Sequence, residues 1–480
     1  MTGLNRQDLV GLFKKKRHGG VKRPPREVIG LWGIHKLNQL GHAPGFAGKA
    51  KDDREEEQED RSHYAMTANV IRRERLSRFV DLARVYRGWN KSELSQALGR
   101  DPTKLIPESG NPKLDLVVGI AEALDWTVGD VAESVWREKI DPGGEFEGLD
   151  YDSLKALALE AHRQGEWKDI LRITKQMRVK SRDGDQRAYA ASLASIAHDG
   201  MGRFTLALKS IQDGLSERLT NEKLRCMLQT NLANTHYALW HLVEAHAIAG
   251  DLITTLESLE NPARIQRVSN AHARYVRGNT LRRMIIEKNV ANIESTSLRA
   301  RIDLEASREQ YLLLSEEFDD DAYRGVANTC LGALHEVDAA SGILDPHEAI
   351  EQIELGLDAV IDPTAVPLGD ILESWGWWAI FGCNISLRHL EGEDLHHHMA
   401  LCTNKAIEIA ERLGNWSMRE RAFTLEHFRR QQAKLEGIPE QGWPLDEDDI
   451  RVITGTMGRF PSFREVGWQI LRGANVLESD

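Results

Sequence analysis

The sequence predicts an all-α protein built from a five-helix N-terminal domain and a C-terminal α-solenoid of helix hairpins. Apolar residues recur every three to four positions in both regions, which is the period of an amphipathic helix. Strand-like alternation of apolar and polar residues is rare after residue 150. A turn element also recurs at intervals of 37 and 38 residues. A chain of 480 residues is long enough for more than one domain.

The first helix of the N-terminal domain is expected from about Arg75 to Gly88. Leu76, Phe79 and Val80 lie on its apolar face, and the glycine ends it. A second helix follows, because Asn90 and Glu93 have the spacing of a capping box, in which each side chain accepts a hydrogen bond from the other residue's backbone. Leu94, Ala97 and Leu98 form its buried face, and Gly99 ends it.

A third helix is expected to begin at Asp101, which is an N-cap residue followed by Pro102 at the first helical position. It would carry Thr103, Lys104, Leu105 and Ile106. Pro107 lacks a backbone N–H and disfavours the helical conformation of the preceding residue. The third helix is therefore expected to be little more than one turn long.

Two further helices complete the domain, from Leu114 to Leu124 and from Val128 to Trp136. The segment resembles the lambda-repressor-like, Cro-type (XRE family) helix-turn-helix domain over about one eighth of the chain. The residues that carry the resemblance are Leu94, Ser95, Ala97, Leu98, Gly99, Glu108, Gly110, Ile120, Ala121, Ala123 and Leu124. The interval from Gly99 to Gly110 is about one residue shorter than is usual in that family.

The resemblance implies that residues 66–140 bind double-stranded DNA, with the third helix in the major groove. The positions that face DNA in such domains are occupied here by Lys91, Arg100, Thr103 and Lys104. Lys and Arg suit phosphates and guanine edges. The alternative is that these are exposed turn residues in a module that has kept its packing and lost its base readout.

The solenoid is expected from residue 150 to about 435. Its turn element appears at Gly165-Glu166-Trp167, at Gly202-Arg203-Phe204 and at Trp240-His241-Leu242, each preceded by one amphipathic helix and followed by another. Such stacked hairpins resemble tetratricopeptide repeats. Looser helix pairs follow in Ala271–Met284 with Leu304–Phe318, in Ala327–Leu355, and in Trp375–Leu413 with Ser417–Leu435. Residues 436–480, where prolines interrupt the helical pattern, are expected to form a cap or tail.

A solenoid of this kind usually presents a concave groove, lined by the first helix of each pair, that binds a peptide or protein partner. Asn231, Asn234 and His236 lie on or near such a helix and are candidates to contact a peptide backbone. The alternative is that they are ordinary exposed polar residues. Trp375, Trp377 and Trp378 are expected to belong to the core or to a contact between repeats, with a groove lining as the alternative.

Charge is unevenly distributed along the chain. Residues 1–49 have a net charge of +8, whereas residues 141–480 have a net charge of −17, within a total of −12. Such an acidic C-terminal region is not expected to bind nucleic acid. Residues 1–65, a basic block followed by an acidic one, are expected to be a disordered tail. An alternative is that translation begins at Met66.

No catalytic motif or cofactor fingerprint was found, so we expect neither an enzyme nor a cofactor. His396, His397 and His398 with Cys402 are the only group with metal-like spacing, and a solvated turn before a helix is the preferred interpretation. The four cysteines, Cys226, Cys330, Cys383 and Cys402, are far apart in the sequence and form no paired motif. All four thiols are therefore expected to be reduced. With no secretion signal and no membrane span, a cytoplasmic location is expected.

The combination of a Cro-type module and a tetratricopeptide-like solenoid resembles bacterial transcriptional regulators in which the solenoid senses a peptide or partner. The resemblance implies a homodimer that reads two DNA half-sites. The competing hypothesis is a protein-interaction scaffold whose helix-turn-helix module no longer reads DNA sequence.

Overall fold

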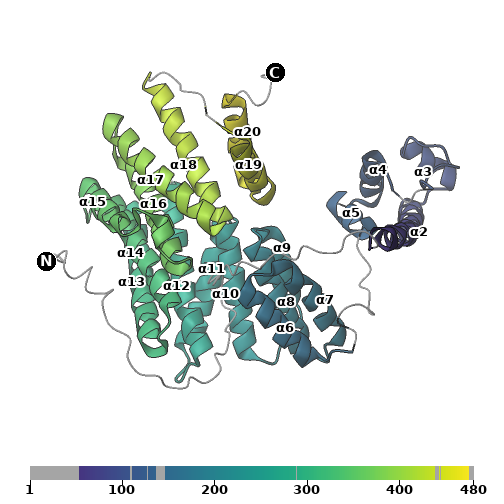
Figure 1. Ribbon diagram of the computed structural model, residues 1–480, viewed down its shortest axis with the longest axis horizontal. Coiled ribbons are helices and arrows are strands. Elements are labelled where there is room, and N and C mark those ends of the chain that lie inside the picture. The colour runs from purple at the N-terminus through teal and green to yellow at the C-terminus, as the bar shows by residue number, and fades with distance from the viewer. Residues whose placement is uncertain are drawn as a thin grey trace. The chain divides into compact units, whose positions relative to one another are not determined.

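The computed structural model describes residues 53–108, 111–126, 128–136, 146, 148–287, 289–437, 443 and 445–474 (Figure 1). These residues form two compact units, one before residue 137 and one after residue 145. Every regular element among them is helical. The predicted all-α class, a helix-turn-helix-like domain followed by a helical solenoid, is therefore confirmed. None of the described helices combines the length and the apolar character needed to cross a lipid bilayer.

The N-terminal unit packs around one small apolar core. Its helices are α2 (Asp53–Arg87), α3 (Lys91–Ala97), α4 (Leu114–Leu124) and α5 (Val128–Trp136). Leu76 of α2, Leu94 of α3 and Ile120 of α4 are fully buried against one another in this core. The predicted capping box at the start of α3 is present, with Asn90 Oδ1 accepting from the backbone N–H groups of Ser92 and Glu93.

The third helix of this unit, predicted to begin at Asp101, is absent. Residues 101–108 form turns and bends instead. The Asp101 carboxylate accepts hydrogen bonds from both the backbone N–H and the hydroxyl of Thr103, which satisfies these groups in a local turn. Pro107 then prevents Ile106 from continuing a helix. The prediction of a five-helix domain was wrong at this element, although Leu105 is still buried in the core.

The boundary of the predicted tail also differs. Helix α2 begins at Asp53, so the later part of the acidic block placed in the tail lies within a helix. The sequence of this stretch is rich in glutamate and arginine, which are good helix formers, and acidic residues suit the N-terminal end of a helix dipole. Residues 1–52 of the predicted tail lie outside the described residues.

The second unit is a succession of antiparallel helices (Figure 1). In chain order they are α6 (Tyr151–Gln164), α7 (Trp167–Lys180), α8 (Gly184–Gly200), α9 (Phe204–Leu215), α10 (Glu222–Ala238), α11 (Leu242–Glu257), α12 (Arg264–Ile286), α13 (Ile293–Phe318), α14 (Asp321–Ser341), α15 (Pro346–Leu357), η1 (Asp358–Val360), η2 (Pro363–Ala365), α16 (Asp370–His389), α17 (Gly392–Leu413), α18 (Trp416–Leu435), α19 (Glu447–Arg459), η3 (Pro461–Phe463) and α20 (Arg464–Gly473).

These helices form stacked hairpins whose first members are α6, α8, α10, α12, α14, α16 and α18. From α8 onward, each first member packs against the next one along the stack. The three recurring turns fall at the hairpin corners α6–α7, α8–α9 and α10–α11. The stretch Trp375–Leu413 contains two helices, because α16 ends and α17 begins around Leu390 and Glu391.

Buried polar contacts fix the order of the first helices. Arg282 of α12 forms an ion pair of 2.7 Å with Glu336 of α14, and Asn384 of α16 donates a 3.0 Å hydrogen bond to the same carboxylate. All three side chains are almost completely buried. A buried charge is tolerated only when it is paired and hydrogen-bonded, so this cluster specifies which helices are neighbours.

The C-terminal cap, residues 445–473, packs on α18 and on the α8–α9 corner. Phe460 and Phe463 of the cap are buried in a cluster with Phe423 of α18 and Phe204 of α9. The cap therefore touches both an early and a late part of the solenoid.

Close packing of α14 against α16 is predicted to depend on Gly332. A Cβ atom at this position would lie 2.6 Å from Cδ1 of the buried Trp378 ring. We expect Gly332→Ala to lower the free energy of unfolding by about 1–3 kcal/mol, measured by thermal denaturation.

The matched control is Gly250→Ala, in the middle of α11, where a Cβ would meet only the end of Arg277 at 3.8 Å. This variant is expected to be neutral or more stable by up to about 1 kcal/mol. Equal effects of the two substitutions would contradict the packing described here.

Candidate functional site

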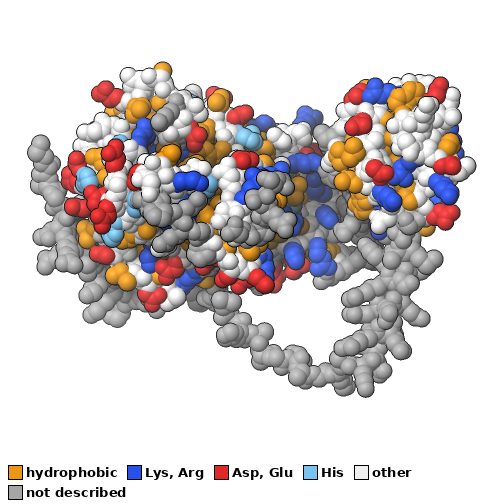
Figure 2. Space-filling view, turned by 90° about the horizontal axis from the view of Figure 1, so that it is seen from above, with side chains coloured by type: hydrophobic (Ala, Val, Ile, Leu, Met, Phe, Trp, Pro, Cys, Tyr) orange, Lys and Arg blue, Asp and Glu red, His pale blue; other side chains and the backbone are white. Residues whose placement is uncertain are grey.

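The first candidate surface is the predicted DNA-contacting face of the N-terminal unit. Lys91 is the first residue of α3, and Lys104 lies in the turn that replaces the third helix; both are exposed. Thr103 is exposed as well, although its hydroxyl donates to Asp101 at 2.6 Å. Figure 2 shows Lys and Arg next to Asp and Glu side chains on the visible face of this unit, so positive charge is not gathered there in one continuous patch.

Arg100 forms an ion pair within this unit, although the sequence predicted that it faces DNA. Its Nη2 atom lies 2.7 and 2.8 Å from the two carboxylate oxygens of Asp115, and its side chain is only 19% exposed. This ion pair ties the end of the α3 turn to the first turn of α4. Arg100 therefore has a structural partner, whereas Lys91 and Lys104 remain exposed cations.

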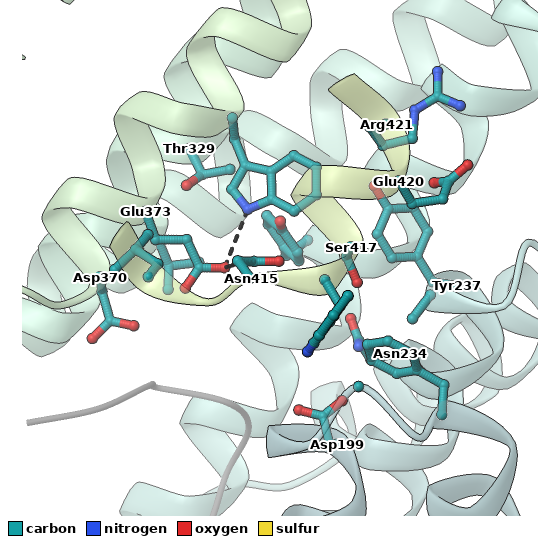
Figure 3. Close-up of a pocket in the computed structure, with 18 of the residues that line it drawn as sticks. Asp199, Asn234, Tyr237, Thr329, Asp370, Glu373, Asn415, Ser417, Glu420 and Arg421 are labelled. Carbon is teal, nitrogen blue, oxygen red and sulfur yellow. Dashed lines mark hydrogen bonds between the residues drawn. The ribbon is translucent and has the colours of Figure 1, made fainter. Parts of the chain in front are cut away.

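The second candidate site is a cavity of about 150 Å³ in the second unit (Figure 3). One water needs roughly 10–15 Å³ on this measure, so the cavity has room for several waters or for a group of side-chain size. It is lined mainly by the first helices of the hairpins. Residues from α8, α10, α12, α14, α16 and α18 contribute, together with Phe460 of the cap.

One side of the cavity is acidic. Asp199 at the end of α8 and Asp370 and Glu373 at the start of α16 all line it. Glu373 accepts hydrogen bonds from Asn415 at 2.9 Å and from the indole N–H of Trp377 at 3.3 Å. Burial, with a smaller contribution from the Glu373 charge, raises the pKa of Asp199 to about 7. Two carboxyl groups from helices far apart in the chain, α8 and α16, thus share one electrostatic environment.

Another side combines arginine and aromatic rings. The Arg283 guanidinium stacks 3.6 Å from the Tyr237 ring and 4.3 Å from the Trp240 ring, and Arg421 lies 4.7 Å from the same indole. Burial lowers the pKa of Arg283 to about 10 and raises the pKa of Glu420 beside these arginines. Cations over aromatic faces are stabilised when they are shielded from water.

Trp240 reaches this position through an unusual backbone conformation. It has a φ of 64°, whereas the two preceding hairpin corners have Gly165 (φ 73°) and Gly202 (φ 70°) at the matching positions. The left-handed region costs a residue with a side chain about 1–2 kcal/mol. The third corner therefore carries strain that the first two avoid, and its indole is placed between Arg283 and Arg421.

The three predicted groove residues have different environments. Asn234 is buried and lines the cavity. Asn231, one turn earlier on α10, is also buried, but it is not among the lining residues. His236 is not among them either, and its Nδ1 atom lies 3.1 Å from Nδ1 of His241 at the hairpin corner. The stack thus brings one of the three to the cavity.

Several lining residues were not singled out by the sequence, including Asp199, Glu373, Arg283 and Arg421. Each lies on a different helix, and no local spacing marks them as a set. Of the three neighbouring tryptophans, Trp375 and Trp378 are buried in the core while Trp377 lines the cavity. The one available local signal was Trp240, because it interrupts a glycine position repeated in the two earlier corners.

The titration of Asp199 predicts a pH-dependent stability. A carboxyl whose pKa is raised to about 7 on folding stays protonated while the unfolded chain ionises. Stability is then lost as the pH rises from about 4 to about 7, by at most about 1.4 kcal/mol per pH unit. We expect Asp199→Asn to become more stable relative to the wild type between pH 5 and pH 8, measured by thermal unfolding.

The control is Asp251→Asn, which removes an exposed carboxyl group of α11 and leaves Asp199 in place. A pH-independent difference for Asp199→Asn would show that its carboxyl is ionised throughout this range.

Comparison with known proteins gives a distant structural likeness. No protein-family model matches the chain, and no curated protein matches it. Among solved structures, the crystal structure of Bacillus thuringiensis PlcR in complex with the peptide PapR7 and DNA shares 14% sequence identity with this chain, with a TM-score of 0.30. The match covers 60% of this chain and 99% of the PlcR chain.

Proposed function

We propose that this chain is a DNA-binding transcription regulator whose solenoid binds a peptide or protein partner. The observation that carries this proposal is the joining of two different units in one chain. One has the packed core and exposed lysines of a helix-turn-helix-like module, and the other encloses a charged and aromatic cavity. A ligand that favours one conformation of the solenoid shifts the population of DNA-competent molecules.

On the N-terminal unit, Lys91 and Lys104 are the residues proposed to contact DNA phosphates, with Thr103 beside them. Since the third helix is replaced by a turn, phosphate contacts are expected to supply most of the affinity and base contacts less of it. A homodimer would compensate for such a weak single module by placing two copies on two half-sites, about one turn of DNA apart.

The cavity favours a ligand that contains both polar and apolar groups. Asn234, Thr329 and Ser417 offer uncharged hydrogen-bonding groups among the aromatic rings and charged side chains (Figure 3). One side chain of a peptide, with the backbone beside it, has this mixture and suits a cavity of about 150 Å³. The position of the cavity on the first helices of the hairpins agrees with such a partner.

A second candidate function is a protein-interaction scaffold. The observation that favours it is the turn at residues 101–108, where a DNA-reading module would present a helix, together with the pairing of Arg100 with Asp115. In this case the N-terminal unit would bind another protein, and any affinity for DNA would be independent of sequence.

The full chain should be incubated with a pool of random duplex DNA at two salt concentrations, and the bound fraction selected and sequenced. A recovered two-fold motif would support the regulator. Binding without a motif that falls steeply with salt would indicate phosphate contacts alone. No binding would support the scaffold.

The two exposed lysines are predicted to contribute phosphate contacts. We expect the double substitution Lys91→Ala and Lys104→Ala to weaken DNA binding by about tenfold or more. Each lost contact should reduce the dependence of log affinity on log salt by about 0.9. Fluorescence anisotropy of a labelled duplex at several salt concentrations measures both quantities.

Lys223→Ala is the matched control, since it removes an exposed lysine from α10 of the acidic second unit. It is expected to leave affinity and salt dependence unchanged. Unaltered DNA binding by the double variant would exclude Lys91 and Lys104 from the interface.

A further inference from the structure

The seam between the C-terminal cap and the α8–α9 corner forms one edge of the second unit's cavity. The Phe204 and Phe460 rings lie 5.3 Å apart, and Arg459 Nε donates a 3.1 Å hydrogen bond to the backbone oxygen of Met201. A Cβ on Gly202 would lie 2.7 Å from the Trp416 ring and 2.9 Å from Cδ of Arg459. The seam is therefore tightly packed.

Three arginines from three elements meet at this seam. Arg203 directly follows Gly202, Arg419 belongs to α18 and Arg459 ends α19. The guanidinium carbons of Arg419 and Arg459 lie 4.7 and 3.7 Å from the centre of the Trp416 ring. Within the described part of the chain, none of the three arginines forms an ion pair with a carboxylate.

The positive charges at the seam are only partly compensated. Burial, followed by the charges of Arg203 and Arg419, lowers the pKa of Arg459. Burial also lowers the pKa of Arg419, with Glu411 of α17 acting in the opposite direction. The Nε atom of Arg419 is buried and has no hydrogen-bond partner among the described residues. A buried donor without a partner costs free energy that a bound acceptor would recover.

Arg459 differs from the other two arginines because it has a packing role. Its Nε and Nη1 atoms donate to the backbone oxygens of Met201 and Gly455, so this side chain holds the cap in place. Arg203 is exposed, and the Arg419 side chain has neither a carboxylate nor a backbone oxygen as a hydrogen-bond partner among the described residues. Two of the three guanidinium groups thus have donors to offer a ligand.

We propose that this seam is an oxyanion-binding site, in which Arg203 and Arg419 hold the phosphate or carboxylate group of a small ligand beside Arg459. Guanidinium groups suit these anions because they present several N–H donors in one plane. The bound anion neutralises the like charges and thereby stabilises the cap against the α8–α9 corner. None of the three arginines is among the residues that line the cavity, and the proposal does not depend on the proposed binding of DNA or peptide.

The test measures thermal unfolding of the full chain against increasing inorganic phosphate, with sodium chloride at equal ionic strength as the reference. A ligand that binds only the folded state raises the melting temperature in a saturable way. We expect this rise in the wild type. In the double variant Arg203→Gln and Arg419→Gln, the apparent dissociation constant for phosphate should be at least about tenfold weaker.

Arg451→Gln is the control, because Arg451 is an exposed arginine of the same α19 helix that already pairs with Asp448 at 2.6 Å. It should keep the wild-type response. A parallel titration with acetate distinguishes the sources: a response to phosphate alone indicates a phosphate-bearing ligand, and a response to acetate indicates a carboxylate. Helical content by circular dichroism confirms that the double variant is folded.

Two results would overturn the proposal. One is a wild-type melting temperature that rises no further in phosphate or acetate than in chloride. The other is a folded double variant with the same saturable rise as the wild type.

Discussion

The docking of the C-terminal cap on the α8–α9 corner is the contact on which the architecture of the second unit depends. It joins residues 258 positions apart in the chain through Arg459 and Met201, and it buries Phe460 against Phe204. Stacked hairpins alone contact only their neighbours and leave an open concave face. With the cap in place, the first helices of six hairpins surround a cavity that the same cap helps to line.

The cavity brings together groups that are far apart in the chain. The carboxyl group of Asp199, at the end of α8, lies in the field of Glu373 on α16. Separately, Trp240 adopts a strained backbone conformation that inserts its ring between two arginines. Raised carboxyl pKa values and backbone strain are typical of sites that bind ligands, because the fold must offset their cost elsewhere. These features single out the cavity as the place where we propose that a ligand binds.

The sequence predicted much of the fold because its signals are local. Capping at Asn90 and the corners at Gly165 and Gly202 depend on residues within one turn of each other, and the structure has them where expected. The segment after Asp101 failed because a side-chain turn with Thr103, together with Pro107, outweighed the helix-start signal. The cavity could not be predicted in detail, since Asp199, Arg283 and Glu373 meet only after the hairpins have stacked and closed. Asn234 was found because it lies on a first helix, but no local pattern separates it from Asn231, one turn away.

Amide hydrogen exchange of the full chain tests the closure most directly. In the wild type, the amides of α19 should exchange slowly, as expected for a helix whose Ile453 and Thr456 are fully buried. Phe204→Ala removes the ring that Phe460 packs against, so the account predicts faster exchange in α19 of that variant and unchanged exchange in α14. Equal exchange of α19 in the two proteins would contradict the account, because it would mean that the cap is held by α18 alone and does not close the cavity.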